Sequence, residues 1–224
     1  MGLKDFFQSR PLTNHLNDRI ELCFSRYGPT LALAGTLTDL KKPLCINNIS
    51  LSIQQDQRQL DFNWLAFRPL TFSQKELLGG DSRSPSKFVV SPGSEHPYHI
   101  LFSDNNAYAE MKDTLETLRT GWEFALTQAG EEADPAEIFQ DFRQQPSTQE
   151  YARILAGFCY WKSGDYELTV NVEARELEAP HRSQKIFRVN EDHTRELLGN
   201  LDELVADVCG RPNTDYTLLL LPLE

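Results

Sequence analysis

The chain has 224 residues, of which 40% are hydrophobic and 25% are charged, and this balance is typical of a folded globular protein. Its formal net charge of −11 disfavours nucleic acid and anionic membrane surfaces as partners, because both are bound through a local surplus of Lys and Arg. No apolar run approaches the about 20 residues that span a bilayer, and residues 1–7 lack a signal-peptide core. The sequence therefore predicts a cytoplasmic protein with no integral membrane segment.

Short alternating segments follow a predicted N-terminal arm at residues 1–18. Apolar and polar residues alternate over 20–25, 31–38, 49–54 and 60–66. A period of two with one apolar face predicts half-buried strands, and a spacing of about 8–12 residues with polar turns predicts an antiparallel sandwich or barrel. Residues 73–86 contain Gly, Ser and Pro without periodicity, which predicts a surface loop before the strand pattern resumes at 88–90 and 98–102.

The period changes from two to between three and four at Asn105. Apolar residues then recur on one face as far as Ala125, which predicts a helix that ends at Gly130. A second helix is predicted from the cap Asp134, which precedes a proline, and a third from Ser147, which has a glutamate three residues later. The sequence therefore predicts a helical segment over residues 105–157, between two strand-rich segments.

The strand pattern returns after this helical segment. Residues 158–174 contain an aromatic cluster, the turn Ser163-Gly164-Asp165 and a strictly alternating strand from Tyr166. Another strand is predicted at 184–189. A late helix is predicted between the cap Asn190 and Gly210, and a nearly all-apolar strand at 216–221.

These elements predict an α+β fold that is mainly β: an antiparallel immunoglobulin-like β-sandwich of about 8–9 strands with a helical insertion and a late helix. One domain over 19–224 with the insertion 105–157 is preferred, because the few strands after Trp161 need partners from the early strands. The alternative is a sandwich over 19–104 followed by an α+β domain over 105–224.

The strand spacing and the Trp-Lys-Ser-Gly-Asp-Tyr segment at 161–166 resemble immunoglobulin-like sandwiches of bacterial surface and accessory proteins. The Cys…Trp…Cys spacing of antibody-type domains is missing. The resemblance concerns architecture, and an architecture by itself implies no function.

Signatures of catalysis and cofactor binding are missing from the sequence. It has no Gly-x-Ser-x-Gly elbow and no glycine-rich phosphate loop. Four scattered cysteines form no Cys-x-x-Cys pair, and a disulfide between Cys23 and Cys45 is not expected. His96 and His99 are three residues apart, and in a strand such residues face opposite ways, so we expect neither a metal site nor a cofactor.

The candidate binding residues lie beside two predicted strands. Tyr160, Trp161 and Lys162 stand at a turn, where exposed aromatic residues would mark a partner surface. His96 and Tyr98 at the start of another strand complete the set. The alternative for Trp161 is that it plugs the open end of the sandwich.

The leading functional hypothesis is a non-enzymatic protein-interaction module within a larger assembly, which presents its loops and the insertion 105–157 to a protein partner. A deep pocket lined by two carboxylates or a histidine cluster would count against it. One alternative is a carboxylate-based hydrolase or sugar-binding enzyme in which Asp165 and Glu95 converge near Trp161. The other is a small-ligand carrier with an internal apolar cavity beneath the helices.

Overall fold

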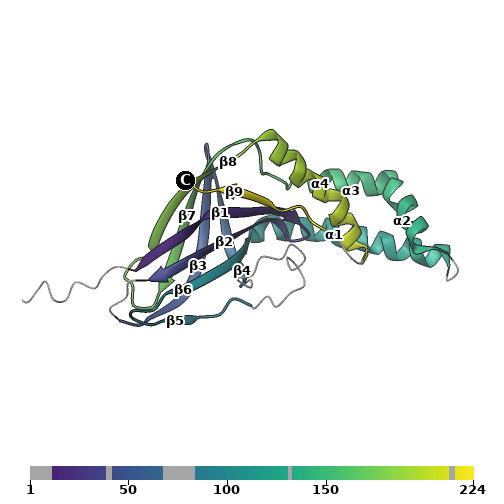
Figure 1. Cartoon of the computed structure of the whole chain (residues 1–224). Coiled ribbons are helices and arrows are strands. Elements are labelled where there is room, and N and C mark those ends of the chain that lie inside the picture. Colours follow the sequence, from purple (N-terminus) through teal and green to yellow (C-terminus); the bar gives the residue numbers. More distant parts are fainter. Residues whose placement is uncertain (1–11, 39–41, 68–83, 131–132, 212–214) are drawn as a thin grey trace, which may run out of the picture.

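The computed structural model describes residues 12–38, 42–67, 84–130, 133–211 and 215–224, as nine strands and four helices (Figure 1). The strands are β1 (Thr13–Ser25), β2 (Gly28–Thr38), β3 (Leu44–Gln55), β4 (Arg58–Phe67), β5 (Phe88–Val90), β6 (His96–Ser103), β7 (Gly164–Ala174), β8 (His181–Val189) and β9 (Leu219–Pro222). The helices are α1 (Asn105–Ala129), α2 (Pro135–Gln144), α3 (Pro146–Ala156) and α4 (Glu191–Val208). The predicted arm up to residue 11, and most of the predicted loop at 73–86, lie outside the described residues, whereas residues 13–18 belong to β1.

The strands form one antiparallel sheet in the order β8-β7-β3-β4-β6-β2-β1-β9, with β5 paired to the beginning of β3. Strands that are far apart in the sequence are neighbours in it. β7 pairs with β3, and β9 pairs with β1. The late strands therefore complete the sheet that the early strands begin.

The predicted immunoglobulin-like sandwich is wrong, because the strands do not separate into two facing sheets. β4 pairs with β3 over Arg58–Phe62 and with β6 over Asn63–Phe67, so one strand joins both halves. At the other side, the backbones of Ile186 in β8 and Glu224 exchange hydrogen bonds of 3.0 and 2.9 Å. The sheet thus curls into a nearly closed barrel. Alternation could not reveal this, since sandwiches and barrels both bury one face of every strand.

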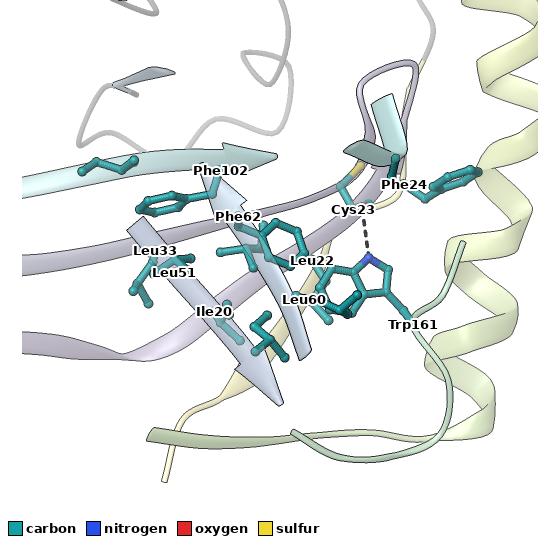
Figure 2. Packing of buried hydrophobic residues seen from close by; sticks show 14 of the residues in the cluster. Ile20, Leu22, Cys23, Phe24, Leu33, Leu51, Leu60, Phe62, Phe102 and Trp161 are labelled. Carbon is teal, nitrogen blue, oxygen red and sulfur yellow. Dashed lines mark hydrogen bonds between the residues drawn. The ribbon is translucent and has the colours of Figure 1, made fainter. Parts of the chain in front are cut away.

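The inward faces of these strands form the core. Large apolar side chains that are fully buried come from early and late strands alike, and Figure 2 shows Phe62 of β4 and Phe102 of β6 together with Trp161 of the segment before β7. The alternation predicted from Tyr166 is present, because Tyr166, Leu168, Val170 and Val172 are all buried. The strand begins at Gly164, whose φ of +154° is a conformation that L side chains rarely adopt.

The helices begin largely where the sequence predicts. Asp134 caps α2 by accepting a hydrogen bond from the Ala136 amide at 2.8 Å, and Asn190 caps α4 through the His193 amide. The predicted cap at Ser147 is wrong, because α3 begins at Pro146, whose fixed φ suits the first helical position.

Helices α1, α2 and α3 project beyond one end of the barrel, and α2 lies farthest from it (Figure 1). α4 packs against β1 and also contacts α1 and α3. Inside the helical segment, Trp122 of α1 packs against Phe139 and Phe142 of α2, with ring centroids 5.9 and 5.7 Å apart. The helical segment consequently has its own aromatic core and a large surface away from the sheet.

Candidate functional site

Trp161 lies inside the barrel and is not exposed at all. Its ring stacks on Phe62 with centroids 5.7 Å apart, and its indole N–H donates to the Cys23 carbonyl at 3.3 Å (Figure 2). The sequence left two alternatives for Trp161, an exposed residue of a partner surface or a residue that fills the open end of the strand core. The structure shows a buried residue that fills the core.

Tyr160 is also buried, and it joins the two ends of the helical segment. Its hydroxyl donates to Asp104 Oδ2 at 2.9 Å. The other carboxylate oxygen of Asp104 caps α1 by accepting from the amides of Asn106 and Ala107. Burial raises the pKa of Tyr160 and the neighbouring carboxylate raises it further, so the hydroxyl remains a donor at neutral pH.

The remaining predicted binding residues are spread over the fold. Tyr98 is buried and donates to Asn14 Oδ1 at 2.8 Å, whereas His96 is half-buried and stacks on Phe88 at 4.5 Å. Burial lowers the pKa of His96. Only Lys162 among the five is exposed. These positions do not test binding itself, so the five residues stay a prediction, but the structure does not bring them together in one open site.

Asp165 and Glu95 do not converge. Asp165 is the second residue of β7 and lies beside the Gln55 end of β3, whereas Glu95 follows β5, which pairs with the Leu44 end. At about 3.3 Å per residue, the two ends of β3 are on the order of 35 Å apart. Both carboxylates belong to exposed residues. The structure therefore lends no support to a shared catalytic cleft for this pair.

A hollow of about 610 Å³ lies on the outer face of β1, β2 and β6. Small side chains, Ala32 and Ala34 of β2, form its floor, which lets Glu21 of β1 and His99 of β6 meet across them at 3.3 Å. Both are buried, with side-chain exposures of 7% and 3%. His99 is thus buried although it lies on the opposite face of β6 from the core residues Tyr98 and Ile100. Asp18 lies at the same hollow.

The most exposed aromatic side chain in the described residues is Phe124 of α1, at 65%. It stands between two further hollows. One, of about 760 Å³, lies between the end of α1 and α2, and the other, of about 700 Å³, lies between the middle of α1 and the start of α3. Gly121 also borders both hollows. Because it has no side chain, the neighbouring Phe142 ring forms part of the wall of the larger hollow. We call these two hollows and Phe124 the Phe124 face.

The Phe124 face is acidic. Its lining includes Asp113 and Glu116 on one side of Phe124 and Asp134, Glu137 and Asp141 on the other, and no Lys, Arg or His among the described residues. The whole segment 105–157 contains ten acidic and four basic residues, a net charge of −6 out of −11 for the chain.

Three of the four basic residues of the segment 105–157 are already paired, and the fourth, Lys112, lies outside the ion pairs of the described residues. Arg119 contacts Glu116 and Glu123, Arg143 contacts Asp202 of α4, and Arg153 contacts Glu150. Within the described part of the chain, by contrast, the ion pairs do not include Asp113, Glu137 or Asp141. The face therefore presents negative charge that the described residues do not neutralise.

Phe124 is not among the residues predicted from the sequence, although its position carries a signal. The buried stripe of α1 includes Leu118 and Trp122, and Phe124 falls outside this stripe, among polar residues. A large apolar residue on the polar face of a capped helix indicates a contact outside the helix.

No helix in the described residues is long and apolar enough to cross a membrane, and none of their His, Cys, Asp or Glu side chains gather as a metal site of three or more. The comparisons with known proteins also leave function to be inferred from the residues themselves. No protein-family model matches the chain, and no curated protein matches it.

Proposed function

We propose that this protein is a protein-interaction module that binds its partner through the Phe124 face of the helical segment. The observation that carries the proposal is the 65% exposure of Phe124 between two hollows, on helices that project away from the barrel (Figure 1). Aromatic side chains of this kind supply much of the binding energy at protein interfaces when a partner covers them.

The architecture of the segment supports the same function. Tyr160 and Asp104 fasten its two ends together, and Trp122 holds α1 to α2. A surface on such a braced support loses little conformational freedom when it binds, and a pre-organised surface binds more tightly for the same contact area.

Site-specific cross-linking tests the proposal. A photo-reactive amino acid replaces Gln128, which borders the larger hollow, and the full chain is irradiated in an extract of its native cells. We expect one dominant adduct, which Phe124→Ser removes. The adduct partner, once identified and purified, should bind the Phe124→Ser chain at least about tenfold more weakly than the unchanged chain, because an interface anchor is worth about 2 kcal/mol.

A photo-reactive group at Glu173, exposed on β7, serves as the control position. The proposal fails if Gln128 and Glu173 give the same adducts, or if the purified partner binds the Phe124→Ser chain unchanged. Melting curves of the Phe124→Ser chain separate loss of contact from loss of fold, and we expect no decrease because this side chain is mainly solvated.

The outer hollow favours a second candidate function, the binding of a small polar molecule such as a monosaccharide. Two carboxylates, those of Asp18 and Glu21, line this hollow together with His99. A pocket with two carboxylates would count against a protein whose only function is to bind other proteins. Labelled alanine methyl groups at Ala32 and Ala34 report on its floor. Saturable shifts of these NMR signals with a panel of monosaccharides would support this function, and unchanged signals at millimolar sugar would dismiss it.

A further inference from the structure

We infer that the partner of the Phe124 face is a basic amphipathic helix of about four to five turns, which carries two apolar side chains about seven residues apart and Lys or Arg beside them. This inference rests on the proposed function, and it adds the chemistry and the geometry of the partner. Charge, length and secondary structure of the partner each follow from a separate feature of the face.

The charge of the partner follows from the lining of the two hollows. All ionisable groups that line them in the described residues, apart from Tyr151, are carboxylates. Asp113 lies on one side of Phe124, and Glu137 and Asp141 lie on the other, all three outside the ion pairs of the described residues. A cationic segment therefore gains attraction at both ends, whereas an acidic segment is repelled.

The helical form of the partner follows from what the face offers. A peptide that adds to a protein as a β-strand needs an open sheet edge, where backbone groups exchange hydrogen bonds with it. The Phe124 face consists of α1, α2 and α3, whose backbone hydrogen bonds are internal. Contact is therefore made by side chains, and an amphipathic helix lays one apolar stripe into such a groove.

The length and spacing follow from the extent of the hollows along α1. They run from Asp113 to Ala129, which is about 24 Å at 1.5 Å per residue, or about 17 residues of a partner helix. The α1 residues of the two hollows are centred about seven positions apart, on either side of Phe124. Two helix turns also span about seven residues, so apolar side chains at i and i+7 enter one hollow each.

Synthetic peptides test this inference with the full chain. The probe is a fluorescein-labelled, alanine-rich peptide of about 17 residues with two leucines seven positions apart and three flanking lysines. Its two comparison peptides carry glutamates in place of the lysines, or alanines in place of the leucines. We expect the lysine peptide to bind at least about tenfold more tightly than either, as measured by fluorescence anisotropy at low salt.

Two triple variants with the same net charge separate site-specific attraction from the overall acidity of the protein. Asp113→Asn with Glu137→Gln and Asp141→Asn removes three charges from the face, and we expect about tenfold weaker binding of the lysine peptide, since each exposed charge contact changes an affinity by up to about fivefold. Glu167→Gln with Glu173→Gln and Glu178→Gln removes three exposed charges from β7 and the turn after it, and we expect less than a twofold change.

The result that overturns the inference is equal weakening by both triple variants, or equal binding of the lysine and glutamate peptides. This failure is distinct from failure of the proposed function. If the partner identified by cross-linking depends on Phe124 but binds the triple variant of the face unchanged, the interaction face stands and the basic-helix partner is wrong. If neither that partner nor the lysine peptide responds to Phe124→Ser, both proposals fail. Melting curves of every variant confirm that each is folded.

Discussion

Tyr160→Phe tests whether the two ends of the helical segment are fastened by one hydrogen bond. The substitution removes only the hydroxyl that donates to Asp104 at 2.9 Å and leaves the buried ring in place. A hydrogen bond to a charged group contributes about 1.5–3 kcal/mol, so we expect the free energy of unfolding to fall by about 2 kcal/mol. For a chain of this length, that corresponds to a decrease in Tm of about 4–8 °C.

Urea unfolding followed by tryptophan fluorescence measures this change, because the buried Trp161 lies next to Tyr160 and is hydrogen-bonded in the folded state. The midpoint should decrease while the slope stays constant. Tyr108→Phe is the matched control, since Tyr108 is exposed at 38% and its hydroxyl has no hydrogen bond among those of the described residues. We expect a change below about 0.5 kcal/mol there.

A double-mutant cycle with Asp104→Ala separates the Tyr160 bond from the helix cap. Asp104→Ala alone removes both, whereas Tyr160→Phe in the Asp104→Ala background has no bond left to remove. We therefore expect a coupling energy of about 1–2 kcal/mol. A coupling near zero, or a Tyr160→Phe chain as stable as the unchanged one, would refute the claim that this bond fastens the segment.

Three further predictions concern packing and ionisation. Gly35→Ala should destabilise by about 1–3 kcal/mol in urea unfolding, because its Cβ would lie 2.6 Å from the Tyr98 hydroxyl, whereas Gly199→Ala, in open space on α4, should stabilise by about 0.5–1 kcal/mol. Burial raises the pKa of Tyr166 to about 12, above the value of about 10 in an unfolded chain, so its contribution to stability is complete below about pH 10 and is lost as pH rises towards 12. Tyr166→Phe should therefore make the decline in urea midpoint between pH 8 and pH 11 shallower. Burial also raises the pKa of Cys159 to about 12, so this thiol should resist alkylation at pH 8 in the folded chain and react within minutes in urea, as peptide mass spectrometry would show.

Local features of the fold were predictable because their causes lie within a few residues. The alternation from Tyr166 determines which side chains enter the core, and it does so whatever the neighbouring strand is. Asp134 and Asn190 mark helix starts because a short polar side chain satisfies amides two or three residues later. At Ser147 the same rule was wrong, since the adjacent Pro146 takes the first helical position.

The candidate site was only partly predictable. The excess of carboxylates over 105–157 and the off-stripe position of Phe124 are visible in the sequence. That Asp113 and Glu137 lie on either side of the same aromatic ring depends on how α1 crosses α2 and α3, which side-chain packing around Trp122 determines. The meeting of Glu21 and His99 likewise depends on the register of three strands.

By itself, the sequence determined most of the strands and helices and the face that these bury, because they depend on periodicity and on caps. Only the tertiary structure decided that β4 is shared by two halves of one sheet, that Ile186 and Glu224 bring its ends together, and that Trp161 is a plug. The physical reason is that pairing between distant strands is set by the summed packing of the whole core. The strands of a sandwich and the strands of a barrel show the same period of two, so this pattern cannot distinguish the two folds.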